Sequence, residues 1–273
     1  MKPRQLGVLA RHAVLIAGSV LVVVPFLWMF TTSLQTRAET YTNTSILPTS
    51  WHWENYARAW QSAPFAQYYA NSLIMAAGIV AGHLVFDSLA AYAFARLEFP
   101  FKRALFTVLL AGLMVPTFVT VIPAYAIVAQ LGWIDSYTAL IVPRLADVFG
   151  IILLRQYFAT IPLELEEAAR IDGCSRSGTF FRVVVPLSTP ALATLAIFSF
   201  LFAWNDFLWP LLVTNNDDMR TIQLGLTSFV GRYGTSWNYL MAGTLTATVP
   251  SIVVFLFFQR ALVRGIATTG LKD

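Results

Sequence analysis

Three groups of polar residues interrupt long apolar segments of this chain. They are His83 with Asp87, Arg144 with Asp147, and Asn205 with Asp206. Trp204 and Trp209 flank the third group. A polar group inside a membrane span is costly, and it usually faces a cavity or another polypeptide. The first two groups are four and three residues apart, so each would lie on one helix face. Two interpretations stay open: contact with a solute in a cavity, or a polar tie between helices or to a partner chain.

The sequence offers little to support other chemistry. It has one cysteine, Cys174, so neither an intramolecular disulfide nor a cysteine metal cluster can form. The histidines, His12, His52 and His83, are too far apart for a metal-ligand motif. The H-E-x-x-H and G-x-S-x-G patterns of two hydrolase classes do not occur, and no lysine follows a glycine as an ATP-binding P-loop requires. We therefore expect no catalytic site, no metal and no bound cofactor in this chain.

The elements that position the polar groups must be membrane helices. Hydrophobic residues make up 57% of the 273 residues and charged residues only 12%, against about 25% in ordinary soluble domains. The mean hydropathy is +0.65. An all-α integral membrane protein is expected, because an open strand cannot satisfy its backbone in lipid.

Six segments have the roughly 20 mostly apolar residues that a spanning helix needs. They are residues 12–34, 68–94, 104–130, 137–160, 187–213 and 238–262, within a single transmembrane domain over residues 1–273. Prolines inside these segments, among them Pro116, Pro143 and Pro190, predict kinks.

The distribution of basic residues predicts the orientation. Thirteen of the 18 Lys and Arg residues lie on the side that holds both termini and residues 161–186. Because Lys and Arg accumulate in cytoplasmic loops, this side is predicted to be cytoplasmic, and the loops 35–67 and 214–237 face outward. The pI near 9.3 then needs no nucleic-acid partner. Segment 12–34 is long for a secretory signal and lacks a nearby small-x-small cleavage site, so we expect it to be retained.

Residues 161–186 are too polar to span a membrane, and they predict two short helices joined by a turn at Asp172-Gly173. The first helix would carry an apolar stripe formed by Ile161, Leu165, Ala168 and Ala169. Glu166 and Arg170 would form an i, i+4 pair on another face. Two interpretations again stay open: the helix packs on its own bundle, or its flat, alanine-rich surface receives another protein.

The same stretch resembles the EAA loop of ABC importer permeases, whose pattern is Glu-Ala-Ala, three residues, Gly, nine residues, then Ile-x-Leu-Pro. The matching residues are Glu167, Ala168, Ala169, Gly173, Val183, Val185 and Pro186, with Val in place of Ile and of Leu. Further stretches extend the resemblance over nearly the whole chain: Glu54–Trp60, Asn71–Ala76, Leu89–Phe99, Ala203–Leu212 and Phe257–Asp273. They are similar to the carbohydrate-uptake branch, and within it to the second, MalG-like permease subunit.

The resemblance implies a type I ABC importer permease fold in a bacterial or archaeal cytoplasmic (inner) membrane. It implies a MalF-like second permease subunit, an extracytoplasmic solute-binding protein that delivers a sugar, and an ATPase dimer that holds ATP and Mg. The residues implied to couple the chain to the ATPase are Glu167, Ala168, Ala169, Asp172, Gly173 and Pro186. The tail, residues 265–273, is implied as a further contact with the ATPase.

For a sugar, the preferred pathway candidates are Trp204, Asn205, Asp206 and Trp209. Amide and carboxylate groups bind hydroxyls, and an indole packs on the apolar face of a sugar ring. A phosphorylated polyol is a second candidate, but it would want convergent basic residues, and only Arg144 lies in a span on the outer side. A secondary transporter is disfavoured, because no internal repeat is evident and the EAA-like loop would be unexplained.

Overall fold

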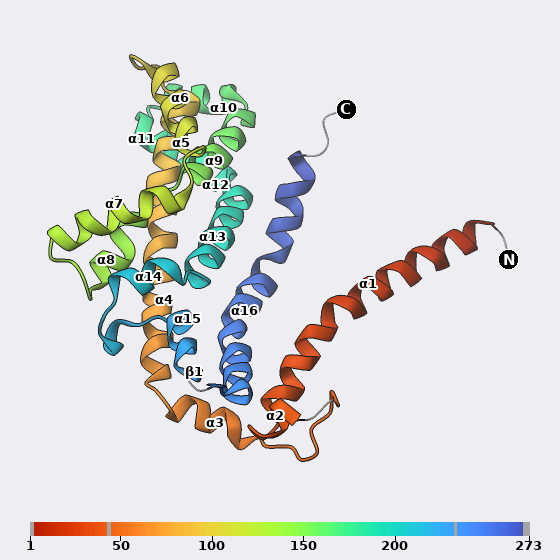
Figure 1. The fold of residues 1–273 in the computed structure, drawn as a ribbon. Coiled ribbons are helices and arrows are strands. Elements are labelled where there is room, and N and C mark those ends of the chain that lie inside the picture. Colours follow the sequence, from red (N-terminus) through yellow and green to blue (C-terminus); the bar gives the residue numbers. More distant parts are fainter. Residues whose placement is uncertain (1–2, 43–44, 232–233, 270–273) are drawn as a thin grey trace. The chain divides into compact units, whose positions relative to one another are not determined.

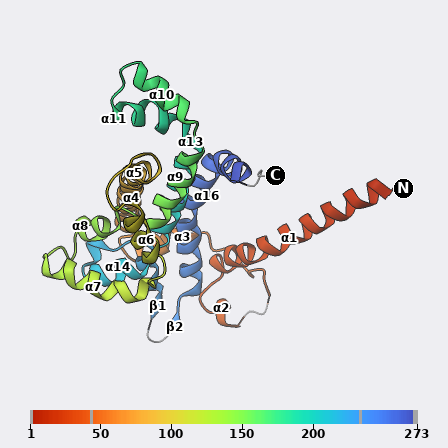
Figure 2. The same cartoon turned by 90° about the horizontal axis from the view of Figure 1, so that it is seen from above.

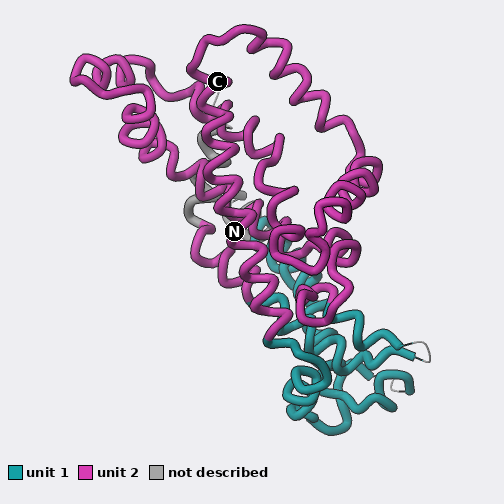
Figure 3. Tube along the Cα trace, turned by 90° about the vertical axis from the view of Figure 1, so that its left-hand side faces the viewer, with its two compact units in different colours: residues 1–66, 225–249 teal, residues 67–224, 250–273 magenta. Residues whose placement is uncertain are grey.

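The computed structural model describes residues 3–42, 45–231 and 234–269, with side chains from residue 11 to residue 259, and these residues are mainly helical (Figure 1, Figure 2). The chain divides into two compact units, drawn in teal and magenta in Figure 3. One contains residues 1–66 and 225–249, and the other contains residues 67–224 and 250–273. Each unit therefore joins segments that are far apart in the sequence.

The first unit begins with α1 (Pro3–Ser33), α2 (Glu39–Thr42) and α3 (Glu54–Gln61). Its later segment contains the 3-10 turn η5 (Leu226–Phe229), the antiparallel pair β1 (Val230–Gly231) and β2 (Gly234–Thr235), and the first part of α16 (Trp237–Thr269). The short strand pair is a small departure from the all-α expectation.

In the first unit, hydrogen bonds anchor the C-terminal end of α1 to α3. Its side chains from residue 11 to residue 28 are exposed. The buried Asn55 of α3 donates hydrogen bonds from Nδ2 to the carbonyls of Ser33 and Gln35, both at 2.9 Å. The long apolar part of α1 is thus free to face lipid or another polypeptide.

The second unit starts with most of α4 (Phe65–Gly82), the π-helical turn η1 (His83–Asp87) and α5 (Ser88–Arg96), which form one continuous helix. Next come α6 (Lys102–Gly112), α7 (Thr117–Gln130), α8 (Tyr137–Ile141), the 3-10 turn η2 (Val142–Arg144) and α9 (Val148–Thr160).

The second half of this unit contains α10 (Leu163–Ile171), α11 (Arg176–Thr179), the π-helical η3 (Phe180–Val184), α12 (Val185–Leu187), α13 (Thr189–Trp204) and α14 (Leu208–Val213). It closes with the 3-10 turn η4 (Asp217–Met219), with α15 (Ile222–Gly225) except for its last residue, and with the part of α16 from Pro250 onward.

Three helices are long and apolar enough to cross a membrane: Arg11–Ser33, Phe65–Arg96 and Trp237–Gln259. They overlap the predicted segments 12–34, 68–94 and 238–262. Three further candidates are bent pairs of helices, with a bend of 100° between α6 and α7, 43° between Tyr137–Arg144 and α9, and 79° between Arg176–Leu187 and α13. Within the described residues the chain thus has three unbroken candidate spans, or up to six if each bent pair counts as one.

The segments 104–130, 137–160 and 187–213, in which prolines predict kinks, are not continuous helices: each contains a break, and the third is also bent by 79° at Ser188. Pro116 is extended (φ −60°, ψ 135°) at the start of α7, and proline disfavours a helical conformation in the residue before it. Pro143 lies in η2, directly before the break at residues 145–147. The third segment breaks at residues 205–207, between α13 and α14.

The core of the second unit lies where α5 meets α9 and α13. Its buried apolar side chains include Ala91, Leu154, Phe158, Phe180, Val184 and Leu195. Glycine allows a close approach beside this core: a Cβ on Gly82 would lie 2.8 Å from the carbonyl oxygen of Leu145, and a Cβ on Gly150 would collide with the carboxylate of Asp87. The helices therefore approach closely at the level of the polar residues.

Candidate functional site

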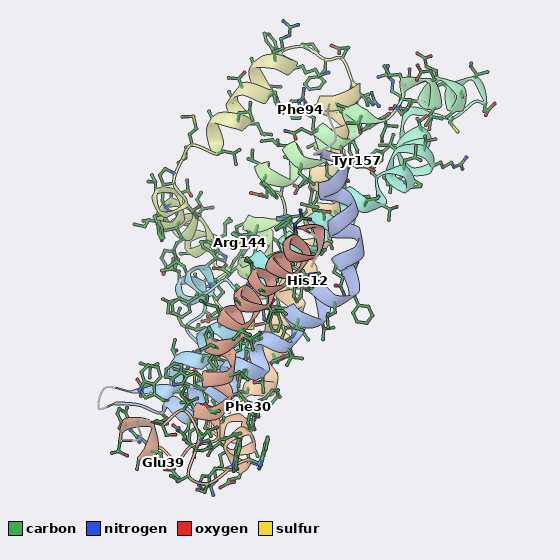
Figure 4. The ribbon with its side chains drawn as sticks, turned by 90° about the vertical axis from the view of Figure 1, so that its right-hand side faces the viewer. His12, Phe30, Glu39, Phe94, Arg144 and Tyr157 are labelled. Carbon is green, nitrogen blue, oxygen red and sulfur yellow. The ribbon has the colours of Figure 1, made fainter. Side chains whose placement is uncertain are left out.

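An ion pair joins two of the helix breaks in the second unit. Arg144, the last residue of η2, places Nη1 2.5 Å from Oδ2 of Asp206, which lies in the turn between α13 and α14. The guanidinium also lies over the rings of Phe202 and Trp209, 5.2 and 5.8 Å from their centroids. The side chains of Arg144 and Asp206 are only 17% and 10% exposed. Burying either charge alone would be costly, and in the pair each charge neutralises the other. Figure 4 labels the position of Arg144.

Local hydrogen bonds explain the position of Asp206. Its Oδ1 accepts a hydrogen bond from the backbone N–H of Trp209 at 3.3 Å, so it caps the first turn of α14. The indole Nε1 of Trp209 donates to the carbonyl of Ala139 in α8 at 2.9 Å. These two bonds hold α14 on α8 and bring Asp206 beside η2.

The expected pair of Arg144 with Asp147 is corrected by this geometry. The carboxylate of Asp147 accepts a hydrogen bond from the N–H of Phe149 at 3.1 Å and caps α9, which is a common role for Asp at a helix start. An intramembrane charge seeks an opposite charge, so Asp206 in the next apolar segment is a partner that the sequence could have suggested, although only Asp147 was grouped with Arg144. Sequence spacing could not reveal which two helix breaks meet.

His83 and Asp87 of η1 form a second polar cluster. The Nε2 of His83 lies 2.9 Å from the carbonyl of Arg144, and Nδ1 lies 2.7 Å from Oγ of Ser199. Because a carbonyl can only accept, Nε2 carries the proton, and in the neutral ring Nδ1 accepts from the hydroxyl. Asp87 is fully buried and accepts at Oδ1 from the N–H of Asp147 at 2.9 Å. These bonds tie η1 to the α8–α9 break and to α13.

The four pathway candidates do not converge on one point. Trp204 is 1% exposed and packs against two aromatic rings at 5.3 and 5.6 Å. Asn205 is exposed, and its amide donates to a carbonyl one turn earlier at 2.8 Å. Asp206 and Trp209 both contact Arg144. The indole of Trp204 is thus unavailable to a solute in this conformation, whereas Asn205 is accessible.

The loop after α9 folds into two short helices joined by a tight turn, as the sequence predicts. The N–H of Cys174 donates to the carbonyl of Ala169 at 2.9 Å, and the N–H of Gly173 donates to that of Arg170 at 3.0 Å. Gly173 has a φ of +86°, so the turn is a glycine-dependent Schellman C-cap. Ser175 then caps α11 by accepting a backbone hydrogen bond at 3.1 Å.

The residues implied to couple the chain to an ATPase lie mainly on an exposed surface. Glu167, Ala168, Asp172, Gly173 and Pro186 are exposed, and Ala169 is half-buried. Apolar side chains beside them are exposed as well, with Leu163 at 54% and Ile171 at 87%. Figure 2 shows α10 and α11 projecting beyond α9 and α13 of the same unit. A surface of this kind is open to a partner protein.

A carboxylate anchors α10, because, of the expected apolar stripe, Ile161 is buried at the end of α9 while Leu165 and Ala168 are exposed. The expected pair of Glu166 with Arg170 is corrected, because Oε1 of Glu166 lies 2.7 Å from Nε of Arg96 and the side chain is 1% exposed. Oε2 accepts a hydrogen bond from the hydroxyl of Tyr92 at 3.1 Å. Arg96 also donates to the carbonyl of Ile161, the C-cap of α9. The sequence signal for this contact was only that Tyr92 and Arg96 share a helix face.

Comparisons with known proteins give a consistent result. The family model described as "Binding-protein-dependent transport system inner membrane component" matches residues 76–268. The sn-glycerol-3-phosphate transport system permease protein UgpE of Yersinia enterocolitica is 35% identical over 264 residues, which are 93% of this chain and 94% of the relative. The arabinooligosaccharides transport system permease protein AraQ of Halalkalibacterium halodurans is 37% identical over 205 residues, 75% of this chain and 74% of the relative.

A solved structure has a similar fold. It is the crystal structure of a bacterial ABC transporter involved in the import of the acidic polysaccharide alginate. One of its chains superposes with a TM-score of 0.83 at 21% sequence identity, covering 95% of this chain and 98% of that chain. At this identity the likeness concerns the fold alone.

Proposed function

The chain belongs to the binding-protein-dependent transport system inner membrane component family, and from that premise we propose that it forms half of the pathway of an ATP-driven importer for an uncharged carbohydrate. Members of this family are permease subunits of ABC transporters, so the chain is a transport protein and not a catalytic subunit. The observation that carries the proposal is the loop of α10 and α11, which is anchored on one side by Glu166 and exposes its EAA residues on the other.

A separate ATPase dimer supplies the energy in this proposal. The chain has no Gly-Lys pair for a P-loop, so ATP and Mg must be held by other subunits. The ATPase would dock on α10, where the small side chains of Ala168 and Ala169 permit close approach and Glu167 offers a charge. Gly173 sets the direction in which the chain leaves this surface.

The same proposal fixes the orientation and the other partners. Residues 161–186 and both termini lie in the cytoplasm, on the side with most of the Lys and Arg residues. The first and last residues, including part of the tail expected to reach the ATPase, lie outside the described part of the chain. A second permease subunit completes the pathway, and an extracytoplasmic binding protein delivers the sugar. The exposed apolar length of α1 offers surface to lipid or to that second subunit.

The chemistry of Arg144 favours an uncharged solute. A solute anion would have to displace the carboxylate of Asp206 from a guanidinium that already lies over two aromatic rings. The accessible Asn205 can instead bind sugar hydroxyls. A phosphorylated polyol is the second candidate, supported by the similarity to a relative named for sn-glycerol 3-phosphate.

The test is reconstitution of the chain with its ATPase, its second permease and its binding protein in proteoliposomes. Glu167→Lys and Gly173→Asp should leave membrane insertion intact and abolish transport-linked ATP hydrolysis, since the first reverses a charge on the exposed surface of the loop and the second strains the turn that shapes that surface. Coupled turnover at the wild-type rate in both variants would refute this role of the loop. Uptake of neutral oligosaccharides against sn-glycerol 3-phosphate then separates the two solute classes.

A further inference from the structure

We propose that the contact of Glu166 with Arg96 and Tyr92 is a rigid joint that passes the movement of α10 to the continuous helix formed by α4, η1 and α5. The inference rests on the proposed function, because it assumes that an ATPase moves α10. It assigns to three residues a positioning role in coupling, one step inside the surface that the ATPase would touch. We call this contact the α10 joint.

The burial pattern of α10 singles out Glu166. Among the residues of α10, Glu166 is the one that is buried, while its neighbour Glu167 is exposed. Successive residues of a helix are about 100° apart, so one helix turns one carboxylate inward and the next outward. The outward carboxylate can meet a partner while the inward one holds the helix to its own unit.

Arg96 connects three elements at one point. It is the last residue of α5, its Nε pairs with Glu166 at 2.7 Å, and it also donates to the carbonyl of Ile161 at the end of α9. Tyr92 lies one turn earlier on the same face, is 5% exposed, and packs against the ring of Phe180 at 5.0 Å. The ends of α5 and α9 and the start of η3 therefore meet at the α10 joint.

The chemistry of the joint makes it stiff. Removing one partner of a buried ion pair leaves an uncompensated charge, so partial separation of Glu166 from Arg96 is strongly unfavourable. A displacement of α10 is thus passed to the end of α5 without slack.

The helix that receives this movement also holds a polar cluster. Phe65–Arg96 is one continuous candidate span, and it contains His83 and Asp87, which bond to the α8–α9 break. In the proposal, movement of α10 is coupled through this helix to the α8–α9 break. The α10 joint supplies a point at which that coupling can be cut without touching the ATPase surface.

The experiment uses the full reconstituted complex and two readouts: the amount of ATPase that co-purifies with the chain, and the solute imported per ATP hydrolysed. Glu166→Gln keeps the shape of the side chain but removes its charge. We expect the ATPase still to co-purify and the import per ATP to fall on the order of five- to tenfold, within the usual range of allosteric coupling. Tyr92→Phe, which removes one hydrogen bond, should produce a smaller loss in the same direction.

The matched control is Glu164→Gln, which removes a carboxylate from the exposed first turn of the same helix and should leave both readouts unchanged. The charge-exchanged variant Glu166→Arg with Arg96→Glu should recover part of the coupling that either single change loses. A Glu166→Gln complex with the coupling ratio of the control, or a loss explained entirely by missing ATPase, would overturn the joint. A wild-type chain that retains no ATPase would instead overturn the proposed function, and the joint with it.

Discussion

The loop of α10 and α11 and the helix breaks around Arg144 both contain charged side chains, but the loop exposes most of them and the breaks largely bury them. In the loop, most of the residues expected to act are close together in sequence and exposed, and the one buried residue of α10 anchors it. At the breaks, the polar residues come from η1, η2, α13 and the turn before α14, and their charged groups are largely buried. The loop can therefore be altered on its surface without disturbing the fold, whereas a change at the breaks alters the packing of several helices.

This contrast predicts that substitutions will separate into two classes. At the breaks, a variant should lose stability first and transport as a consequence. In the loop, a variant should lose coupling while the folded chain persists.

The largest loss should follow removal of one partner of the ion pair at the breaks. Arg144→Met leaves the carboxylate of Asp206 buried without its partner, which costs about 3–5 kcal/mol of folding free energy in comparable sites. The double variant Arg144→Met with Asp206→Leu should recover most of that loss. Thermal unfolding in detergent measures both, and a double variant no more stable than the single one would contradict the pairing.

Gly150→Ala should give the next largest effect. The added methyl group would collide with the buried carboxylate of Asp87, and overpacking of a tight site costs about 1–3 kcal/mol. Gly112→Ala is the matched control, because its Cβ would meet only Val148 Cγ2, at 3.9 Å. The two unfolding temperatures should differ clearly, and equal values would mean that the helices are farther apart than described.

Gly173→Ala should have a smaller effect on stability. A residue with a Cβ pays about 1–2 kcal/mol to adopt the left-handed conformation of the Schellman turn. Gly173→Asn should cost less, because asparagine tolerates that conformation better. Hydrogen exchange of the α10 amides measures the difference. Equal protection in the two variants would show that the turn does not depend on the positive φ.

The smallest expected effect is a loss of stability at low pH in the turn after α1, where Glu39 accepts hydrogen bonds. The pKa of Glu39 is lowered to about 2, first by the hydrogen bond from the Thr49 hydroxyl and then by the N–H of Thr36. Because the pKa of Glu39 is lower in the folded chain, its ionised carboxylate stabilises the fold. This stabilisation is fully present above the unfolded pKa near 4.5 and is lost as the pH falls toward 2. The protection factors of the Thr36 and Thr49 amides, corrected for the intrinsic exchange rate, should fall in that window, and Glu39→Gln should abolish the pH dependence of this protection. Unchanged exchange would refute the capping role.

The sequence predicted the loop better than the breaks, for physical reasons. The two short helices, their turn at Gly173 and the cap at Ser175 follow from local rules that act within a few residues. The membership of the transporter family was also predicted from the EAA pattern and is confirmed by the family match. Local rules could not reveal that Glu166 would pair with Arg96, because that choice depends on how α5 meets α10.

The pairing of residues at the helix breaks could not be predicted from local sequence, because the partners are far apart in the chain. Prolines predicted kinks, and two of the breaks do lie at prolines: one follows Pro143, and the other lies at Pro116, directly before α7. The size of the bend between α6 and α7, 100°, was unexpected. The sequence grouped Arg144 with Asp147 because they are three residues apart, whereas in the structure Arg144 pairs with Asp206. Long-range pairing in a bundle is set by the packing of several helices together, so it becomes visible only in the structure.

The most direct test of the account is a cysteine cross-link from the exposed face of α10 to the ATPase. The chain would carry Ala168→Cys in a Cys174→Ser background, with Thr42→Cys on the expected outer side as the control. The account predicts that Ala168→Cys forms a cross-link with the ATPase subunit and is labelled only by reagents that reach the cytoplasm, while Thr42→Cys does neither. Labelling of Ala168→Cys from the outside, or no cross-link in a complex that hydrolyses ATP and transports, would contradict it.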